Sequence, residues 1–468
     1  MGLKDEIQEV AIAMDQANAP AGVAPLAIRN IGIPDFNTAR NGFVRIFSSA
    51  ARTALTKVAA TIHRNDALVS SVMDLGIFEA RLRQCFADLH SEGRLSHSDD
   101  NALEISRREV RNWIKDDLDT LQTDFTHHLP AWTLGIEFVR PFAIGPVTFR
   151  GKFDWIDSVD FPQGAIERFL DAREFNQRWK EILKEALNPR SEDEPQGLAT
   201  SLLSALKNCP SVLSVNVNGY EKQLSKKVAD IVCKSGLDAV SLIFGGKDFF
   251  HKQALHSDSV VPVLTESILE TNGYLWLPGS KMSLRMVSTD RNQMSQHLLK
   301  AAVAPLVASV GRILQALIDP SSSSHPDLAK RWSTALDWLA DGTREKNDAV
   351  AVAKIGTSLD VLACGGKYSG IVDMMVNLTG MQATDAVTHG TAPKSLSDVV
   401  KIVYNEGRSQ VLHGTHFDRL KSFQEHRAFA EHLAIAALIE SAIRLDTYAG
   451  PDESFAFRTM QKRPVGQA

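Results

Sequence analysis

The chain has 468 residues, of which 44% are hydrophobic and 23% are charged, and this composition excludes wholesale disorder and a fibrous repeat. The net charge of −5 excludes a protein whose entire surface wraps nucleic acid, although it allows a local basic pocket. The length suggests about three folding units.

Cysteine usage and hydropathy indicate the compartment. The four cysteines are scattered and form no C-x-x-C pair, so neither a disulfide framework nor a cysteine zinc site is indicated: Cys85, Cys209, Cys233 and Cys364. The first residues are charged, and the apolar stretch around Pro305 and Arg312 is interrupted by these two residues. We therefore expect a cytoplasmic protein that does not contact membranes.

The first region, residues 1–190, is expected to be helical with a short strand section near 131–160. Between residues 40 and 125, apolar residues recur three and four apart in three stretches, which predicts three amphipathic helices: residues 40–63, 66–90 and 102–125. Residues 132–156 are instead rich in β-branched and aromatic residues punctuated by Gly and Pro, which predicts strands. A further helix is predicted at about 164–187.

The second region, residues 198–320, follows a polar and acidic run at 188–197 that is typical of a linker. It is predicted to form an α/β or α+β module ending in a long helix. The pattern indicates a strand at 211–220, a helix at 221–236, a strand at 237–246, further strands within 260–287, and a helix at about 293–318.

The third region, residues 325–450, begins after a serine run and shows only helical patterns. Five helices are predicted there, at 328–340, 348–363, 367–378, 396–407 and 417–445, and residues 451–468 are expected to be a flexible tail. Taken together, the chain is predicted to be α+β, mainly α, with a C-terminal helical bundle preceded by a mixed helical and small-sheet region.

The segment from Tyr404 to Asp418 carries the residues suited to chemistry. Arg408 and His413 stand five positions apart, and Gly407 and Gly414 bracket them, so we expect the helix to break there and the two side chains to converge. Arginine presents a planar fork of donors that suits a phosphate, and histidine transfers protons near neutral pH. The pair therefore suits phosphodiester chemistry.

RNA carries its own nucleophile, the 2′-hydroxyl, so its cleavage needs proton transfer and charge neutralisation but no metal. We expect His413 to transfer the proton, Arg408 to hold the scissile phosphate, and a 2′,3′-cyclic phosphate to result. One histidine does not easily serve as acid and base in the same step, so a symmetric dimer with two such motifs facing one groove is part of the hypothesis.

The run Y-N-E-G-R-S-Q-V-L-H-G from Tyr404 to Gly414 resembles the signature of Apea-like HEPN domains. The stretches at 331–342 and 354–366 resemble the first two helices of that family. The resemblance covers about the last 140 residues, and Ser409 after the arginine is usual in this branch.

The resemblance implies a dimerising helical bundle and a metal-independent endoribonuclease with Arg408 and His413 as the active-site pair. It also implies no cofactor and a role in antiphage defence or as a growth-arresting toxin. A regulatory partner or a phage trigger fits such a role.

Other residues of the third region allow several interpretations. Asp360, where family members tend to carry glutamate, and Tyr404 either orient Arg408 or are polar groups satisfied by their neighbours, and His416 either lines the same groove or faces water. Trp332 and Trp338 are interpreted as core residues rather than base-stacking groups.

Two alternatives to the nuclease stay open. His413, His416, Asp418 and His426 offer ligand atoms for a metal, although their spacing matches no established zinc pattern. The whole domain is alternatively a catalytically silent dimerisation module, or one that binds nucleotide or RNA without cutting it.

Overall fold

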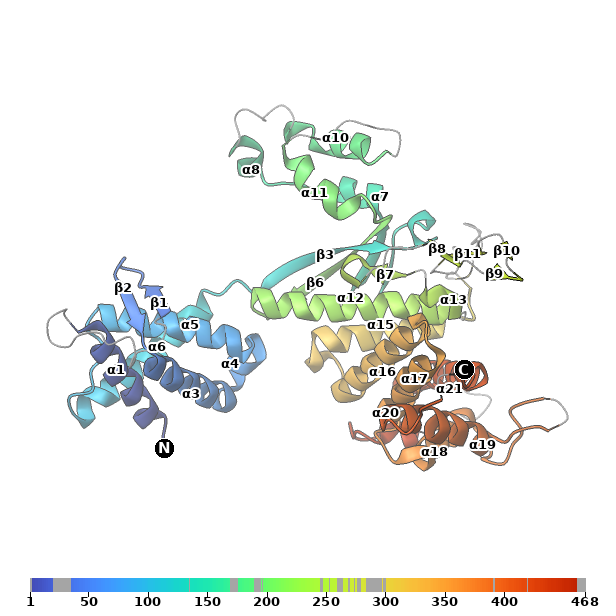
Figure 1. Cartoon of the computed structure of the whole chain (residues 1–468). Helices are drawn as coiled ribbons and strands as arrows, with labels where there is room; N and C mark the ends of the chain where they lie inside the picture. The colour runs from blue at the N-terminus through green and yellow to red at the C-terminus, as the bar shows by residue number, and fades with distance from the viewer. Residues whose placement is uncertain are drawn as a thin grey trace. The chain divides into compact units, whose positions relative to one another are not determined.

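The computed structural model is α+β and mainly helical, as predicted (Figure 1). It divides into two units, residues 1–125 with 217–227 and residues 126–216 with 228–468, and each is described here by itself. The structure describes residues 2–19, 35–133, 135–168, 176–188, 195, 197–244, 247–251, 253–258, 264–267, 270–272, 274–275, 279–282, 297, 300–389, 392–418 and 420–460.

The first unit is a helical assembly that carries a β-hairpin. Its elements are α1 Leu3–Asn18, β1 Asp35–Thr38, β2 Val44–Phe47, α3 Ser49–Asn65, α4 Ala67–Val72, α5 Leu75–Ser91 and α6 Asp100–Asp119. The predicted helix over 40–63 is wrong in its first part, because Gly42, with φ of +88°, turns the chain between β1 and β2. The helix begins only at Ser49, where the Ser48 hydroxyl accepts a hydrogen bond from the Ala51 N–H as an N-cap.

A five-stranded sheet lies at the centre of the second unit. Its strands are β3 Asp124–Trp132, β4 Phe142–Ile144, β5 Val147–Gly151, β6 Ser211–Asn218 and β7 Ala254–Leu255, in the order β4-β5-β6-β3-β7. β5 and β6 are antiparallel, with Phe149 opposite Leu213. Because β5 and β6 come from either side of the expected linker at 188–197, residues 198–320 do not form a separate module.

Residues 237–244 form no strand, contrary to the prediction. They belong to a single long helix, α12, which spans Lys222–Phe244. Leu237, Val240 and Leu242 are all buried, so the run is buried on several sides, and periodicity does not separate a strand from a buried helix in so short a run.

Smaller elements surround the sheet. They are the 3₁₀ turn η1 Ile136–Phe138, the helices α7 Lys152–Ser158, α8 Gln163–Arg168, α10 Trp179–Ala186, α11 Leu198–Leu206 and α13 Lys247–Phe250, the turn η3 His256–Asp258, and the short strands β8 Leu264–Ser267, β9 Glu270–Thr271, β10 Tyr274–Leu275 and β11 Gly279–Met282. α7, α10 and α11 share a core with Val212 of β6. The middle of the helix predicted at 164–187 and much of the strand region at 260–287 lie outside the described residues.

Glycines lie where α12 and α15 pack against the sheet, and Figure 1 shows both helices beside it. α15 spans Ala304–Ile318, and the start of the helix predicted from about residue 293 lies outside the described part. A Cβ on Gly145 would lie 2.2 Å from the Gly311 carbonyl oxygen, so the turn between β4 and β5 meets α15 backbone to backbone. This contact needs glycine on both sides.

The C-terminal bundle follows α15. Its elements are η4 Pro320–Ser322, α16 Pro326–Arg344, α17 Asp348–Leu362, α18 Lys367–Thr379, α19 Leu396–Lys401, the π-helical η5 Ile402–Ser409, α20 Gln410–Leu412, α21 Gln424–Leu445 and the 3₁₀ turn η6 Ala456–Arg458. The helices predicted from 328, 348 and 367 are present, whereas the last helix begins at Gln424 rather than Phe417. Trp332 is fully buried and its indole N–H donates to the Leu438 carbonyl, so it is a core residue, while Trp338 is 38% exposed.

Part of the expected flexible tail is packed. Phe457 is fully buried, and the Arg458 guanidinium donates to the carbonyl oxygens of Ala363 and Cys364 at the end of α17. An apolar side chain and a cation at a helix C-terminus hold residues 451–460 against the bundle. Residues 461–468 lie outside the described residues.

The length and hydropathy of the described helices, taken singly, do not meet what a membrane span requires. No single one of them is both long and apolar enough to cross a membrane. α17 and α18 meet the criteria only as a pair, and that pair is bent by 67°.

Candidate active site

The segment that carries Arg408 and His413 is helical almost throughout. α19 begins with a capping box between Ser395 and Asp398 and continues through the π-helical η5 into α20. The predicted break at Gly407 is therefore wrong. The helix ends at Leu412, and Gly414, with φ of +68°, turns the chain away after His413. π-helical turns occur frequently at functional sites, because one extra residue re-aims the side chains around it.

Gly407 has a packing role instead of a helix-breaking one. It is buried, and a Cβ at this position would lie 2.3 Å from Val352 Cγ1 on α17. The absence of a side chain lets η5 lie directly on α17, which brings the next residue, Arg408, to the carboxylate on that helix.

Asp360 and Tyr404 hold the Arg408 guanidinium. Its Nη2 lies 2.9 Å from Asp360 Oδ2, and its Nη1 lies 3.4 Å from the Tyr404 hydroxyl, while the guanidinium carbon lies 5.2 Å from the centre of the Tyr404 ring. The Arg408 and Asp360 side chains are 20% and 17% exposed. Charge-assisted contacts of this kind fix both the position and the orientation of the guanidinium group.

The contacts leave hydrogen-bonding capacity unused. Arg408 Nε and Asp360 Oδ1 are buried and have no hydrogen-bond partner within the described residues. A guanidinium has five N–H donors, of which Asp360 and Tyr404 use one each. Donors of the guanidinium therefore remain for a phosphate.

Gly356 makes this arrangement sterically feasible, and the sequence analysis did not single it out. A Cβ on Gly356 would lie 2.8 Å from Arg408 Cβ and 3.2 Å from Arg408 Cγ. A glycine inside a helical pattern is the signal that was available, because it costs about 1 kcal/mol relative to alanine and so points to a close approach.

His413 lies at the end of α20, and its side chain is exposed. Its backbone N–H donates to the Ser409 carbonyl at 3.0 Å, whereas its imidazole makes no hydrogen bond, ion pair or ring contact with any described residue. In particular, no hydrogen bond joins Arg408 and His413, so a single chain does not bring the two together as expected from the spacing. The histidine is accessible to another molecule.

The His416 ring is one of three rings, with Phe423 and His426, that contact one another in sequence. It packs edge-on against Phe423, with centroids 4.8 Å apart, and Phe423 in turn contacts the ring of His426 at 5.0 Å. His426 Nε2 lies 3.7 Å from a carboxylate oxygen of Glu406. Burial lowers the pKa of His426, and Lys421 acts in the same direction, whereas Glu406 opposes the shift.

The metal alternative gains no support from this geometry. His416 and His426 are directed to Phe423, and His413 faces outward. Among the residues that the structure describes, no three His, Cys, Asp or Glu side chains are grouped so that they could hold a metal ion.

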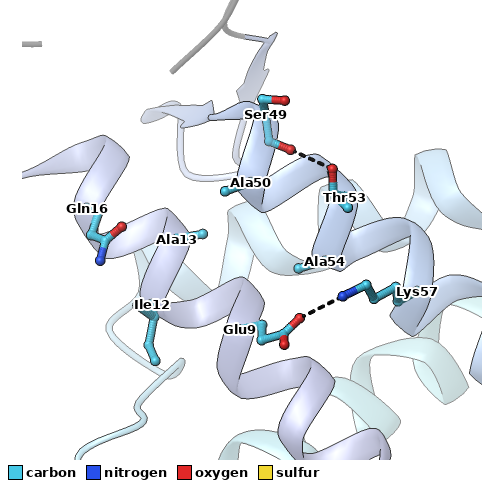
Figure 2. Close-up of a pocket in the computed structure, with 9 residues that line it drawn as sticks. All are labelled: Glu9, Ile12, Ala13, Gln16, Ser49, Ala50, Thr53, Ala54 and Lys57. Carbon is cyan, nitrogen blue, oxygen red and sulfur yellow. Dashed lines mark hydrogen bonds and ion pairs between the residues drawn. The ribbon is translucent and has the colours of Figure 1, made fainter. Parts of the chain in front are cut away.

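A concavity lies in the first unit, between α1 and α3 (Figure 2). It has a volume of about 450 Å³ and a floor of alanines that includes Ala13, Ala50 and Ala54. The Glu9 carboxylate and the Lys57 ammonium pair at 3.2 Å across it. Its charged lining groups, Glu9 and Lys57, thus neutralise each other.

Comparison with known proteins finds no relative: no protein-family model, no curated protein and no solved structure matches this chain.

Proposed function

We propose that the C-terminal bundle is a HEPN-type, metal-independent endoribonuclease that acts as a dimer, in antiphage defence or as a growth-arresting toxin. The observation that carries this proposal is the contrast between the two signature residues. Arg408 is held in place by Asp360 and Tyr404, whereas His413, five residues later, ends its helix with an exposed and unpartnered imidazole. A fixed cation and an accessible proton carrier on one helical segment suit phosphodiester cleavage once a second copy of the chain completes the groove.

The reaction assigns one task to each residue. The 2′-oxygen loses its proton and attacks the adjacent phosphorus, and the bond from phosphorus to the 5′-oxygen breaks as that oxygen is protonated. The products are a 2′,3′-cyclic phosphate and a 5′-hydroxyl. His413 transfers a proton, and Arg408 offsets the charge that grows on the non-bridging oxygens.

A second copy of the chain completes the site. Proton removal and proton delivery need two groups, and a two-fold axis supplies His413 from each copy in one groove. The exposure of His413 supports this arrangement, because the imidazole is free to face a partner. The remaining parts of the chain choose the RNA or hold the nuclease quiet until a trigger or a regulatory partner acts.

One observation favours the silent module as a second candidate. The ion pair between Arg408 and Asp360 joins η5 to α17, which is what a purely structural arginine would do. In that case His413 carries no chemistry, and the bundle serves dimerisation or binds RNA or nucleotide without cutting it.

The experiment compares purified full-length wild type, Arg408→Ala and His413→Ala on single-stranded RNA. His432→Ala is the matched control, because His432 is also an exposed histidine of the bundle. We expect His413→Ala to lose activity by about 10²- to 10⁴-fold, the range of general acid-base catalysis, and Arg408→Ala by about 10²- to 10³-fold, the range for loss of one charge-stabilising donor, both with unchanged circular dichroism. Chelator should leave wild-type cleavage unaffected, and the new ends should be cyclic phosphates.

Cleavage by His413→Ala at the wild-type rate would overturn the nuclease assignment. Absence of cleavage by every variant on all RNAs tested, with dimerisation intact, would instead favour the silent module.

A further inference from the structure

The loop after His413, defined as residues 414–418 and 420–423, carries two almost fully exposed apolar side chains. Phe417 is 91% exposed and Leu420 is 95% exposed. Leaving such a side chain in water forgoes about 1.5–3 kcal/mol of burial free energy. Their exposure beside the candidate active site therefore points to an interaction surface.

The backbone of this loop is held in place. The N–H groups of Thr415 and His416 both donate to the Gln410 carbonyl, at 3.0 and 3.1 Å, and fold the loop back onto the last turn of the helix. The Asp418 carboxylate accepts a hydrogen bond from the Leu420 N–H at 2.9 Å. Phe417 is thus presented by an ordered turn that begins directly after His413.

The two phenylalanines of the loop differ in their surroundings. Phe423 is 2% exposed, its ring contacts those of His416 and His426, and Lys421 Nζ lies 5.1 Å from its centre. Phe417, by contrast, has no ring or cation partner among the described residues, and both faces of its ring are open. Phe423 anchors the loop, and Phe417 is left for a ligand.

The charges beside Phe417 suit nucleic acid. Lys421 is exposed, and the one described carboxylate of the loop, Asp418, already accepts a hydrogen bond from the Leu420 N–H. An exposed aromatic ring next to cationic groups is the arrangement with which proteins bind single strands: the ring stacks on a base and the cations follow the phosphates.

We propose that Phe417 stacks on a nucleobase of single-stranded RNA, next to the phosphate that Arg408 and His413 engage. This inference rests on the proposed function and names a binding contact for it. Leu420 has no π face and is not assigned to RNA. The competing occupant for Phe417 is an apolar surface of a second copy of the chain, and the substitutions below separate the two.

The test uses three substitutions that retain different properties of the ring. Phe417→Tyr keeps an aromatic face, Phe417→Leu keeps an apolar side chain without one, and Phe417→Ala removes both. Phe455→Leu is the matched control, because Phe455 is another exposed phenylalanine of the bundle. The probe is a fluorescent 2′-O-methyl RNA 12-mer, which the protein is unable to cut because the nucleophilic hydroxyl is blocked.

We expect Phe417→Tyr to bind the probe within about twofold of wild type, whereas Phe417→Leu and Phe417→Ala should both weaken binding about 5- to 150-fold, which corresponds to the loss of one base stack. The dimer dissociation constant from sedimentation should stay the same in all variants. Wild-type affinity in Phe417→Leu, a weakened dimer in Phe417→Ala, or no binding of the probe by wild type would each overturn the proposal.

Cleavage of unmodified RNA separates this inference from the proposed function. If Arg408→Ala and His413→Ala abolish cleavage while Phe417→Leu leaves both KM and probe affinity unchanged, the nuclease stands and the stacking contact does not. If neither active-site variant affects cleavage, the nuclease assignment fails whatever Phe417 does.

Discussion

Arg408 Nη2 lies 2.9 Å from Asp360 Oδ2, so a carboxylate on α17 holds the cation that the proposed reaction needs at the phosphate. This pairing has two opposite effects on activity. It orients the guanidinium, and it also offsets part of the positive charge that would attract a phosphate.

We predict that Asp360→Asn lowers the kcat of RNA cleavage by about tenfold or more. The guanidinium loses its fixed position in this variant, and the rate depends on holding a catalytic group in the correct geometry at the reacting phosphate. Asp360→Glu should recover much of the activity, since it restores the carboxylate. The measurement is steady-state kinetics, with circular dichroism to verify folding. An increase in kcat for Asp360→Asn would show that the carboxylate restrains the arginine rather than positioning it.

A second prediction concerns the close approach of α17 and η5. Gly356→Ala places a Cβ 2.8 Å from Arg408 Cβ, and relieving such overpacking typically costs about 1–3 kcal/mol. We expect a lower unfolding midpoint in urea and, because Arg408 is displaced, a loss of cleavage. Gly76→Ala in α5 is the matched control, since a Cβ there meets nothing within 4 Å. It should leave stability unchanged or raise it by up to about 1 kcal/mol.

A third prediction concerns the buried ion pair that joins α12 and α16. Asp238 is 1% exposed and pairs with Arg344, whose Nε also donates to the Phe250 carbonyl at 2.8 Å. Burial raises the pKa of Asp238 to about 6, although Arg344 and Lys234 act in the opposite direction.

Because the folded-state pKa lies above the ordinary value of 3.8, the folded chain holds a proton that the unfolded chain releases between those two values. The contribution of Asp238 to stability therefore falls as pH rises from about 4 to about 6.

Asp238→Asn removes this titration. Relative to wild type, the free energy of unfolding of the variant should rise with pH over that window by an amount on the order of 3 kcal/mol. Urea denaturation at several pH values measures the difference, with Asp341→Asn, at a more exposed carboxylate facing the same ion pair, as the control. A difference between Asp238→Asn and wild type that does not change with pH would contradict the assignment.

Much of the C-terminal bundle was predictable because its helices are long, amphipathic and well punctuated. The prediction of a helix from 348 agrees closely with α17, where the Asn347 side chain accepts the Val350 N–H as an N-cap. Sequence patterns gave wrong predictions where an apolar run was short, or where a glycine that often ends a helix serves instead as a close packing contact. Gly407 is an ordinary helix-breaking signal in sequence, yet it serves as a packing contact with Val352.

The sequence by itself determined the mainly helical class, most helices of the C-terminal bundle and the candidate pair Arg408 and His413, because periodicity, caps and side-chain chemistry are local properties. Only the tertiary structure decided that strands from both sides of the expected linker join in one sheet and that the chain stays helical through Gly407. It also decided that Arg408 pairs with Asp360, whereas His413 makes no hydrogen bond with Arg408. Those features depend on contacts between residues far apart in the chain, such as Gly356 with Arg408, and no local pattern encodes such a contact.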